Sequence, residues 1–344
     1  MPPSFPYPST LGAWAPSPLT WAPGTGHLCV SSPGPHNRSG FSTLRASYPL
    51  KLLAPSPLPS QPPHLALCYT LAYGGGLVAA DAISLSIEVE EDAALILLTQ
   101  GSTKVFKHRP GLRPASHGQG PGRKQEGEGD GTTRQRMLVR LASRSMLLLL
   151  PDSISPFRSS RYAQAQRFIL PSDETSSVLI LDWVNSGRQA DGEVWSMARY
   201  SSTNEIFLGS TKTNNSTKSN ESLLGEKRLI MRERTLLEQN NRHPKADIAH
   251  KLAPYHVYAN ILIIGPHVFP LLKYLTDLCA MTSQFQAARP QKVIWSFSPV
   301  EDGKGGVVRV AADEVEDARA WIREVFDKGG VRDLVGDGLW GRII

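Results

Sequence analysis

The sequence predicts a mainly β fold with a few α-helices, the clearest two of them near the C-terminus. Three observations support this fold class. Apolar and polar residues alternate with a period of two along much of the 344-residue chain. Seven or so strand candidates come before any convincing helix. Strands and helices also do not alternate as they do in doubly wound α/β proteins, so layers of β-sheet are expected.

The strand candidates follow one another through the middle of the chain. In the segment 83–90 the odd-numbered residues are Ile, Leu, Ile and Val, whereas the even-numbered ones are Ser or Glu. This alternation is typical of a strand that is buried on one face. The short apolar run 93–98 predicts a strand that is buried on both faces. The other candidates are 136–150, 176–184, 193–200, 228–237 and 258–265, and the hairpin strands 293–300 and 305–312.

Two helices are predicted late in the chain. In the segment 270–285, leucines recur at helical spacing. The segment 313–326 has a buried stripe at the same spacing, and its first residues resemble a capping box. In that motif Asp313 would cap the helix while Glu316 reaches back to the cap.

Composition indicates one domain with flexible segments around and within it. Residues 1–26 are rich in proline and are expected to be disordered. The Gly-rich segment 117–133 and the Asn/Ser-rich segment 210–222 have too few apolar residues to pack, so they predict flexible insertions. The elements around them are too short to form separate cores. We therefore expect a single β-rich domain over 27–326, followed by a C-terminal tail at 327–344.

Charge and cysteine content narrow the class of protein. The net charge of +6 is spread thinly along the sequence, and the stretch 226–234 mixes its Lys and Arg with Glu. It predicts a solvated strand face and not a nucleic-acid surface. The three cysteines form no C-x-x-C pair, which suits a reducing compartment. With no secretory signal and no apolar run long enough for a bilayer, a cytoplasmic protein without membrane or nucleic-acid partners is expected.

Motifs for catalysis, nucleotides or a permanent metal are not found. The triple glycine at Gly74, Gly75 and Gly76 lacks the lysine and helix of a phosphate-binding loop. It predicts a turn that needs positive φ or close backbone approach, with Asp81 opening the next strand. The chain has no H-E-x-x-H, paired C-x-x-C or G-x-S-x-G motif. The sequence therefore predicts no enzyme and no firm metal site, although a transient metal contact stays open.

Polar and charged residues gather in three segments of the middle chain. Arginine and aromatic residues together are typical of interface hot spots, and surface ion pairing on strands is the alternative explanation. The candidate site residues are Thr99, Gln100, Thr103 and Lys104 in the first segment, Arg158, Arg161, Tyr162 and Gln164 in the second, and Asp182, Ser186, Gly187, Arg188 and Glu193 in the third.

The chain resembles the UreD/UreH family of urease accessory proteins. The resemblance rests on five segments in the family's order and on a closing helix, "ARAWIREVF". The five segments are "YPLKLL" (48–53), "GGGLVAAD" (74–81), "TQGSTKVFK" (99–107), "PDSISPFRSSRYAQAQRF" (151–168) and "LDWVNSGR…GEVW" (181–195). The eukaryotic, fungal-like form fits best. The Pro-rich N-terminus, the two insertions and Gly101 depart from the family pattern.

This resemblance implies stacked sheets in a β-helix-like arrangement. It also implies a non-catalytic scaffold that binds the urease apoprotein and, through a UreF-type partner, recruits a UreG-type GTPase to insert nickel into urease. The scaffold would hold no permanent cofactor, since it handles nickel transiently and the partner binds GTP. The first group of candidates would then shape a polar strand end, the second would contact partners or a tunnel, and the third would provide polar lining and a turn. A generic β-rich interaction module unrelated to urease is the alternative function.

Overall fold

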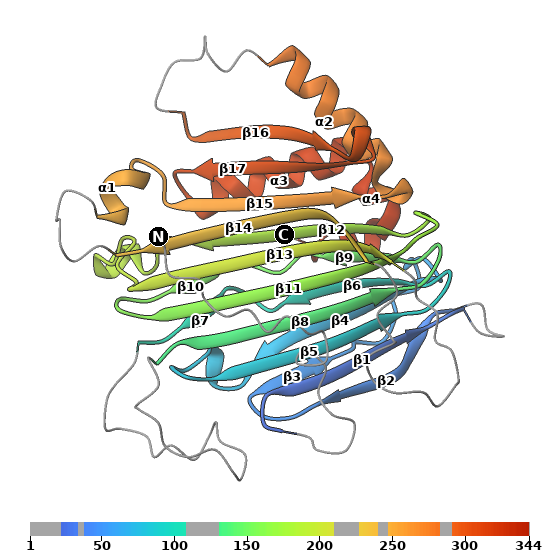
Figure 1. The fold of residues 1–344 in the computed structure, drawn as a ribbon, viewed down its shortest axis with the longest axis horizontal. Coiled ribbons are helices and arrows are strands. Elements are labelled where there is room, and N and C mark those ends of the chain that lie inside the picture. The colour runs from blue at the N-terminus through green and yellow to red at the C-terminus, as the bar shows by residue number, and fades with distance from the viewer. Residues whose placement is uncertain are drawn as a thin grey trace.

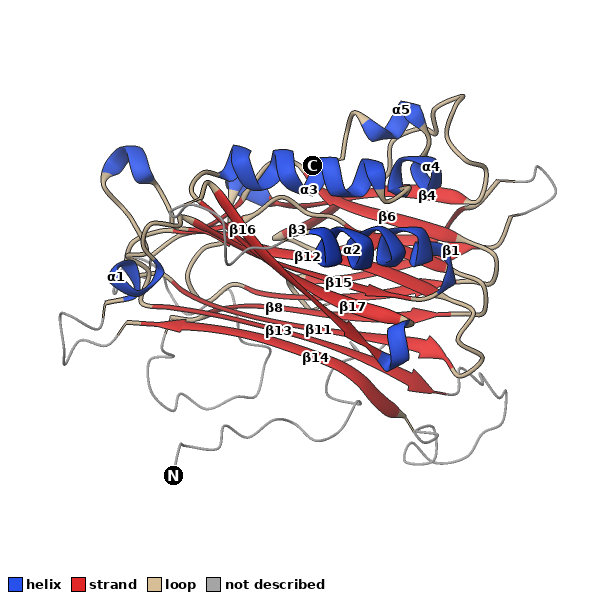
Figure 2. Cartoon of the chain, turned by 90° about the horizontal axis from the view of Figure 1, so that it is seen from above, coloured by secondary structure: helices blue, strands red, loops and turns tan. Residues whose placement is uncertain are grey.

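The computed structural model describes residues 22–33, 38–107, 131–209, 227–239, 247–282 and 291–343. Two large β-sheets lie face to face, and the main helices cover the outside of one of them (Figures 1 and 2). The predicted mainly β class and the C-terminal position of the main helices are confirmed. The insertion expected at 210–222, most of the one at 117–133 and most of the Pro-rich N-terminus lie outside the described residues.

The first sheet has seven strands, and its inner strands are parallel. Neighbouring strands from β13 to β1 pair in parallel, while β14 and β2 close the two edges in antiparallel orientation. In spatial order the strands are β14 (Arg228–Glu238), β13 (Arg199–Gly209), β11 (Arg161–Pro171), β8 (Thr133–Leu141), β5 (Ala82–Val89), β1 (Thr25–Ser31) and β2 (Gly40–Ala46).

The second sheet has ten strands. Its central strands β12, β9, β6 and β4 are parallel, and the hairpin strands predicted near the C-terminus extend it at one edge. In spatial order the strands are β16 (Val293–Val300), β17 (Gly305–Ala312), β15 (Val257–Ile264), β12 (Ser177–Asn185), β9 (Met146–Leu149), β6 (Ala94–Thr99), β4 (Leu65–Ala72) and β3 (Leu50–Leu53). Off this order, β10 (Ile154–Pro156) pairs with β12, and β7 (Thr103–Val105) pairs with β10.

The chain alternates between the two sheets. From β4 to β13 it passes to the other sheet after one or two strands, and each return places a new strand parallel to the one laid down before. Parallel neighbours need a crossover connection, and here a strand of the opposite sheet takes the place of the usual helix. The two sheets therefore grow together along the same direction.

Two apolar cores follow from this layering. One lies between the sheets, and it includes Leu85, Val139 and Phe168 of the first sheet. The other lies between the second sheet and the C-terminal helices, and it includes Ile96 and Leu148. Because β6, β9 and β12 meet apolar layers on both sides, their residues are almost all buried. The prediction that the run 93–98 is buried on both faces is confirmed.

The helices lie mainly on the outer side of the second sheet, as Figure 2 shows for α2, α3, α4 and α5. No helix of the described residues is long and apolar enough to cross a membrane. The helices are α1 (Ile248–Leu252), α2 (Phe269–Met281), α3 (Val315–Lys328), α4 (Val331–Val335) and α5 (Asp337–Trp340), and the 3-10 turns are η2 (Tyr73–Gly75), η4 (Gln189–Asp191), η6 (Pro266–Val268) and η8 (Glu301–Gly303).

The predicted capping box at the start of α3 is wrong. Glu314 occupies the cap position, and no side chain forms a capping hydrogen bond there. The backbone N–H of Asp313 instead donates to the carbonyl oxygen of Lys292 at 2.9 Å. Asp313 thus continues the hairpin of β16 and β17, and the helix begins one residue later than the capping box requires.

Two of the predicted strands also differ from the structure. The segment 136–150 is divided by a turn in which Arg144 has a φ of +55°, so it forms β8 and β9 in different sheets. The segment 193–200 contains a turn at Trp195, where φ is +48°, and the strand begins only at Arg199. The first four strands, β10 and β11 were not predicted. In β11 the side chains that face the other sheet include Tyr162 and two glutamines, which hides the apolar alternation.

Candidate functional site

A carboxylate lies in the interior between the two sheets. Asp182 is near the middle of β12, where Ile180 and Val184 share its side of the strand and belong to the core between the sheets. Strand alternation therefore directs the Asp182 side chain toward the first sheet. The pairing of β11 with β13 places polar side chains of that sheet opposite it.

Four side chains donate hydrogen bonds to Asp182. The Ser202 hydroxyl and the Asn204 amide donate to Oδ2 at 2.6 and 2.7 Å. The Gln164 amide and the Tyr200 hydroxyl lie 3.3 and 3.5 Å from Oδ1. Together with two neighbours, these residues form the interior polar cluster. Its members are Tyr162, Gln164, Gln166, Asp182, Tyr200, Ser202 and Asn204.

Burial raises the pKa of the Asp182 carboxyl above its ordinary value of 3.8, because the charged form loses its hydration. The hydrogen bonds from Ser202, Asn204 and Gln164 oppose this effect without cancelling it. A buried carboxylate is held in such a place only by donors of this kind. Asp182 is therefore an interior acid whose charge depends closely on its surroundings.

Two tyrosines stack beside the carboxylate. The rings of Tyr162 and Tyr200 lie 5.7 Å apart and nearly parallel. Burial, and then the charge of Asp182, raise the pKa of both phenols well above 10, so both carry their proton. The Tyr162 hydroxyl lies 2.9 Å from Oε1 of both Gln135 and Gln164. It has one proton, so it donates to only one of them at a time.

Two carbonyl oxygens of the interior polar cluster have no hydrogen-bond donor among the described residues. They are Oε1 of Gln166 and Oδ1 of Asn204, both buried. These residues are direct neighbours across the β11–β13 pair. Buried acceptors are normally satisfied by protein or by ordered water. These two oxygens are therefore buried acceptors that the described residues leave unpaired.

A second group of candidate residues lies at the strand ends near β10. Glu193 accepts hydrogen bonds from Arg188 Nη2 at 2.6 Å and from the backbone N–H of Arg158 at 3.1 Å. The bonds from Arg188 lower the pKa of Glu193 below its ordinary value. The Arg188 guanidinium also stacks on the Phe157 ring at 4.5 Å. These four residues form the surface cluster, in which both arginines remain about half exposed.

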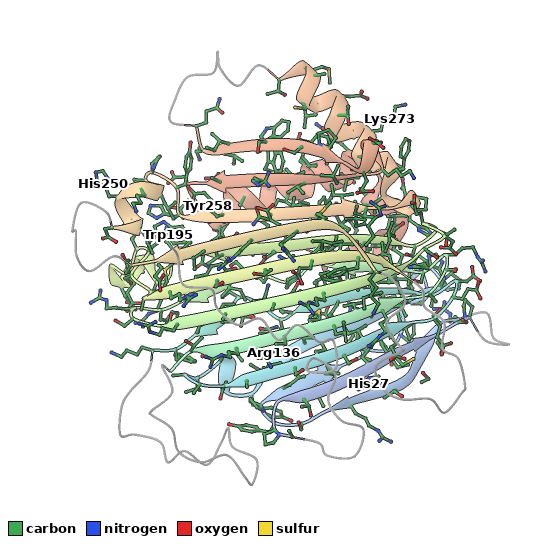
Figure 3. All side chains as sticks on the ribbon, in the orientation of Figure 1. His27, Arg136, Trp195, His250, Tyr258 and Lys273 are labelled. Carbon is green, nitrogen blue, oxygen red and sulfur yellow. The ribbon has the colours of Figure 1, made fainter. Side chains whose placement is uncertain are left out.

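A glycine turn holds the surface cluster in place. Gly187 has a φ of +106°, and a Cβ there would lie 3.0 Å from the carbonyl oxygen of Pro156. Its N–H donates to Asn185 Oδ1 at 3.0 Å. Ser186 is buried, and its carbonyl accepts from the N–H of Trp195 at 2.7 Å. The Trp195 ring in turn packs edge-on against Tyr258, near α1 (Figure 3).

The first group of candidates surrounds the break between β6 and β7. Thr99 accepts from the backbone N–H of Asp152 at 2.8 Å and donates to the carbonyl of Gly101, whose φ is +76°. Thr103 and Lys104 pair with β10. Lys104 is exposed, and so is Gln100. This group shapes the end of two strands and does not reach the interior polar cluster.

The triple glycine forms the predicted turn. Gly74 and Gly75 have φ values of +78° and +74°, and a Cβ on Gly76 would lie 2.7 Å from the carbonyl oxygen of Lys104. Asp81 accepts a hydrogen bond from the N–H of Val78 at 2.7 Å and directly precedes β5. Both conditions predicted for this segment, positive φ and close backbone approach, are thus met.

The candidate residues fall in three places and not in one site. Tyr162, Gln164 and Asp182 meet in the interior, whereas Arg158 and Arg188 meet at the surface. Arg161 pairs with Arg199 on the outer face of the first sheet, away from both places. Within the described part of the chain, no three His, Cys, Asp or Glu side chains are arranged to hold a metal ion.

Comparison with known proteins identifies the family. Residues 24–336 match the model of the UreD urease accessory protein. The chain belongs to the UreD urease accessory protein family. This is a non-catalytic accessory family, so the chain is not an enzyme.

Relatives within the UreD family cover most of the chain. Urease accessory protein 4 of Cryptococcus neoformans is 52% identical over 92% of this chain and 93% of its own length. A ureD-like urease accessory protein of Schizosaccharomyces pombe is 29% identical over 81% of the chain and 86% of its own length. Urease accessory protein D of Arabidopsis thaliana is 26% identical over 87% of the chain and 94% of its own length. The predicted fungal-like form is confirmed.

Sequence reasoning missed four of the seven members of the interior polar cluster. Tyr200, Ser202 and Asn204 lie on β13, and Gln166 lies on β11. A signal was present in the segment 199–209, because polar residues occupy both alternating sets of positions there. When such a strand lies inside a sheet that packs on another sheet, the polar side chains of one of its two faces must be buried. In this UreD family member that set surrounds Asp182.

Proposed function

We propose that this protein is a non-catalytic scaffold for urease maturation in the cytoplasm. It binds the urease apoprotein and, with UreF-type and UreG-type partners, supports GTP-dependent insertion of nickel into the urease active site. Membership of the UreD urease accessory family supports the maturation role. Its three cysteines form no disulfide, which supports a reducing compartment. GTP is bound by the partner, and this chain has no permanent cofactor.

The interior polar cluster supports a transient passage of nickel through this chain. The cluster offers the Asp182 carboxylate and the unpaired oxygens of Gln166 and Asn204 between two otherwise apolar sheets. Oxygen ligands hold Ni²⁺ less firmly than imidazole or thiolate ligands do. A group of oxygen ligands of this kind lowers the free energy cost of desolvating the ion, and it binds the ion weakly enough for the ion to leave. Nickel is thus cargo, and Asp182 is its proposed contact.

The surface cluster and the strand end at Thr99 are the proposed partner contacts. The buried Glu193 carboxylate orients the Arg188 guanidinium, and it binds the backbone N–H of Arg158, whose Nε lies 4.0 Å away. Preorganised arginines with an aromatic neighbour are typical of interface hot spots. The alternation of the chain between two parallel-stranded sheets supports the β-helix-like description of the scaffold.

A deletion strain tests the maturation role. Loss of this chain is expected to abolish urease activity while urease protein still accumulates. The purified chain is expected to form a complex with the urease apoprotein and the UreF-type partner. Full urease activity in the deletion strain, together with no complex, would overturn the proposed function.

Asp182→Asn tests the nickel contact. The variant keeps the shape of the side chain and removes its charge. Urease is expected to be activated poorly at limiting nickel and restored by excess nickel, while the complex with the partners still forms. Asp173→Asn, at a surface carboxylate of the turn before β12, is the control and should activate urease fully. Normal activation by Asp182→Asn at limiting nickel would refute the contact but leave the scaffold role standing.

A further inference from the structure

A row of polar side chains crosses the inner face of the second sheet from the interior toward its edge. Asp182 of β12 pairs with Asn260 of β15, and Asn260 pairs with Arg309 of β17. Cross-strand partners point to the same side of a sheet, so all three side chains face the first sheet. The row therefore runs sideways from the buried carboxylate toward β16, the strand at this edge.

A second polar row lies opposite on the first sheet. Asn204 of β13 pairs with Glu233 of β14, and the nearby Ser202 pairs with Thr235. Because β14 is the last strand of the first sheet, this row also ends at an edge. The two rows meet across the interface between the sheets.

The two rows touch at three successive places. In the interior, the Asn204 amide donates to the carboxylate of the interior polar cluster at 2.7 Å. One strand further out, the Asn260 amide donates to Thr235 Oγ1 at 3.0 Å. At the outermost contact, Nε and Nη2 of Arg309 donate to the two carboxylate oxygens of Glu233 at 3.2 and 2.7 Å. We call this series of contacts the polar seam.

Exposure rises along the polar seam. The interior pair is buried, the middle pair is half-buried, and the Arg309 side chain is 47% exposed. The Glu233 side chain is only 14% exposed, so the arginine lies over the carboxylate. The polar seam is therefore a route of polar atoms from the surface to Asp182, through an interface that is otherwise largely apolar.

We propose that the polar seam is a side entrance through which small cations reach Asp182, and that the Arg309–Glu233 ion pair is its gate. This inference rests on the proposed function, because it supplies the route by which nickel cargo enters the interior polar cluster. With the arginine turned outward, the route has a carboxylate at each end. The described side chains of the seam between those ends are neutral amides and hydroxyls, so a cation is attracted along the route and an anion is repelled.

The gate can open while the strands stay paired. The Arg309 side chain is about half exposed, so it can turn into solvent without moving the backbone of β17. Water screens an ion pair of this exposure, so breaking it changes stability little. A second ion pair, between Arg228 and Glu301 at 2.9 Å, joins β14 to the turn η8 and holds the two sheet edges together when the gate is open.

Cysteine labelling of the full chain tests the gate. The parent chain carries Ser202→Cys, which places a thiol in the interior polar cluster, and the gate variant adds Arg309→Gln. The matched control adds Arg332→Gln instead, which removes an ion-paired arginine of nearly the same exposure from α4. The probes are two small methanethiosulfonates, one with an ammonium group and one with a sulfonate group. Mass spectrometry follows each cysteine separately, so the buried Cys68 reports on general loosening of the core.

We expect the gate variant to be labelled at position 202 about tenfold faster by the cationic probe at low salt, because the uncovered Glu233 gathers cations at the entrance. The control should stay within about twofold of the parent, and the anionic probe should react slowly with all three chains. Equal rates in the gate variant and the control would overturn the inference, and so would an equal rise at Cys68 or with the anionic probe. These outcomes leave the proposed function standing, because the deletion strain tests that function separately.

Discussion

Asp182 shows how one residue can tie stability to pH. Its pKa is raised in the folded protein, because burial penalises the charged form more than the donors Ser202 and Asn204 favour it. The folded state therefore binds a proton more tightly than the unfolded chain. At pH values between the ordinary pKa of 3.8 and the raised pKa of the folded protein, the folded state binds more protons than the unfolded chain does. Stability from this group is present at low pH and is lost as the pH rises through the folded pKa.

We predict that Asp182→Asn removes this part of the pH dependence. The free energy of unfolding, from urea titrations at several pH values above 4, should fall less steeply with rising pH in the variant than in the parent. The Asp173→Asn control lies at an exposed turn where hydrogen bonds lower the carboxyl pKa, so its effect should have the opposite sign. The same slope in the Asp182→Asn variant and the parent would contradict the assignment.

The turn at Gly187 leads to a second prediction about a single residue. Gly187→Ala places a Cβ 3.0 Å from the Pro156 carbonyl oxygen at a φ of +106°, and should cost about 1–3 kcal/mol of stability. Gly192→Ala is the control, because its φ of +69° is left-handed but no atom lies within 4 Å of the new Cβ. Its cost should be near 1 kcal/mol. Thermal unfolding compares the two, and equal losses would show that the close approach is unimportant.

Among the secondary-structure elements, α3 begins differently in the structure from what the sequence predicted. A side-chain cap contributes about 1 kcal/mol. Because Asp313 forms no such bond, we predict that Asp313→Ala changes stability by less than about 0.5 kcal/mol. Ile322→Ala, in the buried stripe of the same helix, should instead cost about 2–5 kcal/mol. Chemical denaturation of both variants tests this. If Asp313→Ala lowers the free energy of unfolding by about 1 kcal/mol or more, Asp313 does cap the helix.

The elements also show what could be predicted from sequence. Strands that present one apolar face, such as β5, and strands that are apolar throughout, such as β6, were predicted because burial alone determines their pattern. The strand β11 was not, because its inward Gln164 is stabilised by Asp182 and Ser202 from other strands. Asp182 could be selected because it interrupts an apolar run. Its partners Ser202 and Asn204 could not, since their roles depend on the pairing of β11 with β13.

The C-terminal residues matter for the whole molecule. Beyond Phe326 the chain continues into α4 and α5, where Val331, Val335 and Leu339 are buried in the core against the second sheet. We predict that a chain ending at Phe326 loses several kcal/mol of stability, since each large apolar side chain contributes about 1.5–3 kcal/mol when buried. Thermal melting and solubility measure the loss. A truncated chain that melts with the full-length one would show that these helices do not stabilise the fold.

The alternation of the chain between the two sheets has a consequence for how the protein folds. Strands that pair in parallel are separated in the sequence by a strand of the opposite sheet, so neither sheet can be completed before the other. Pairing between strands that are distant in sequence makes folding slow. Until β14 and β16 close their sheets, the strand placed last presents unpaired backbone groups at an open edge. The chain is therefore most prone to aggregate during folding, before its last strands are in place.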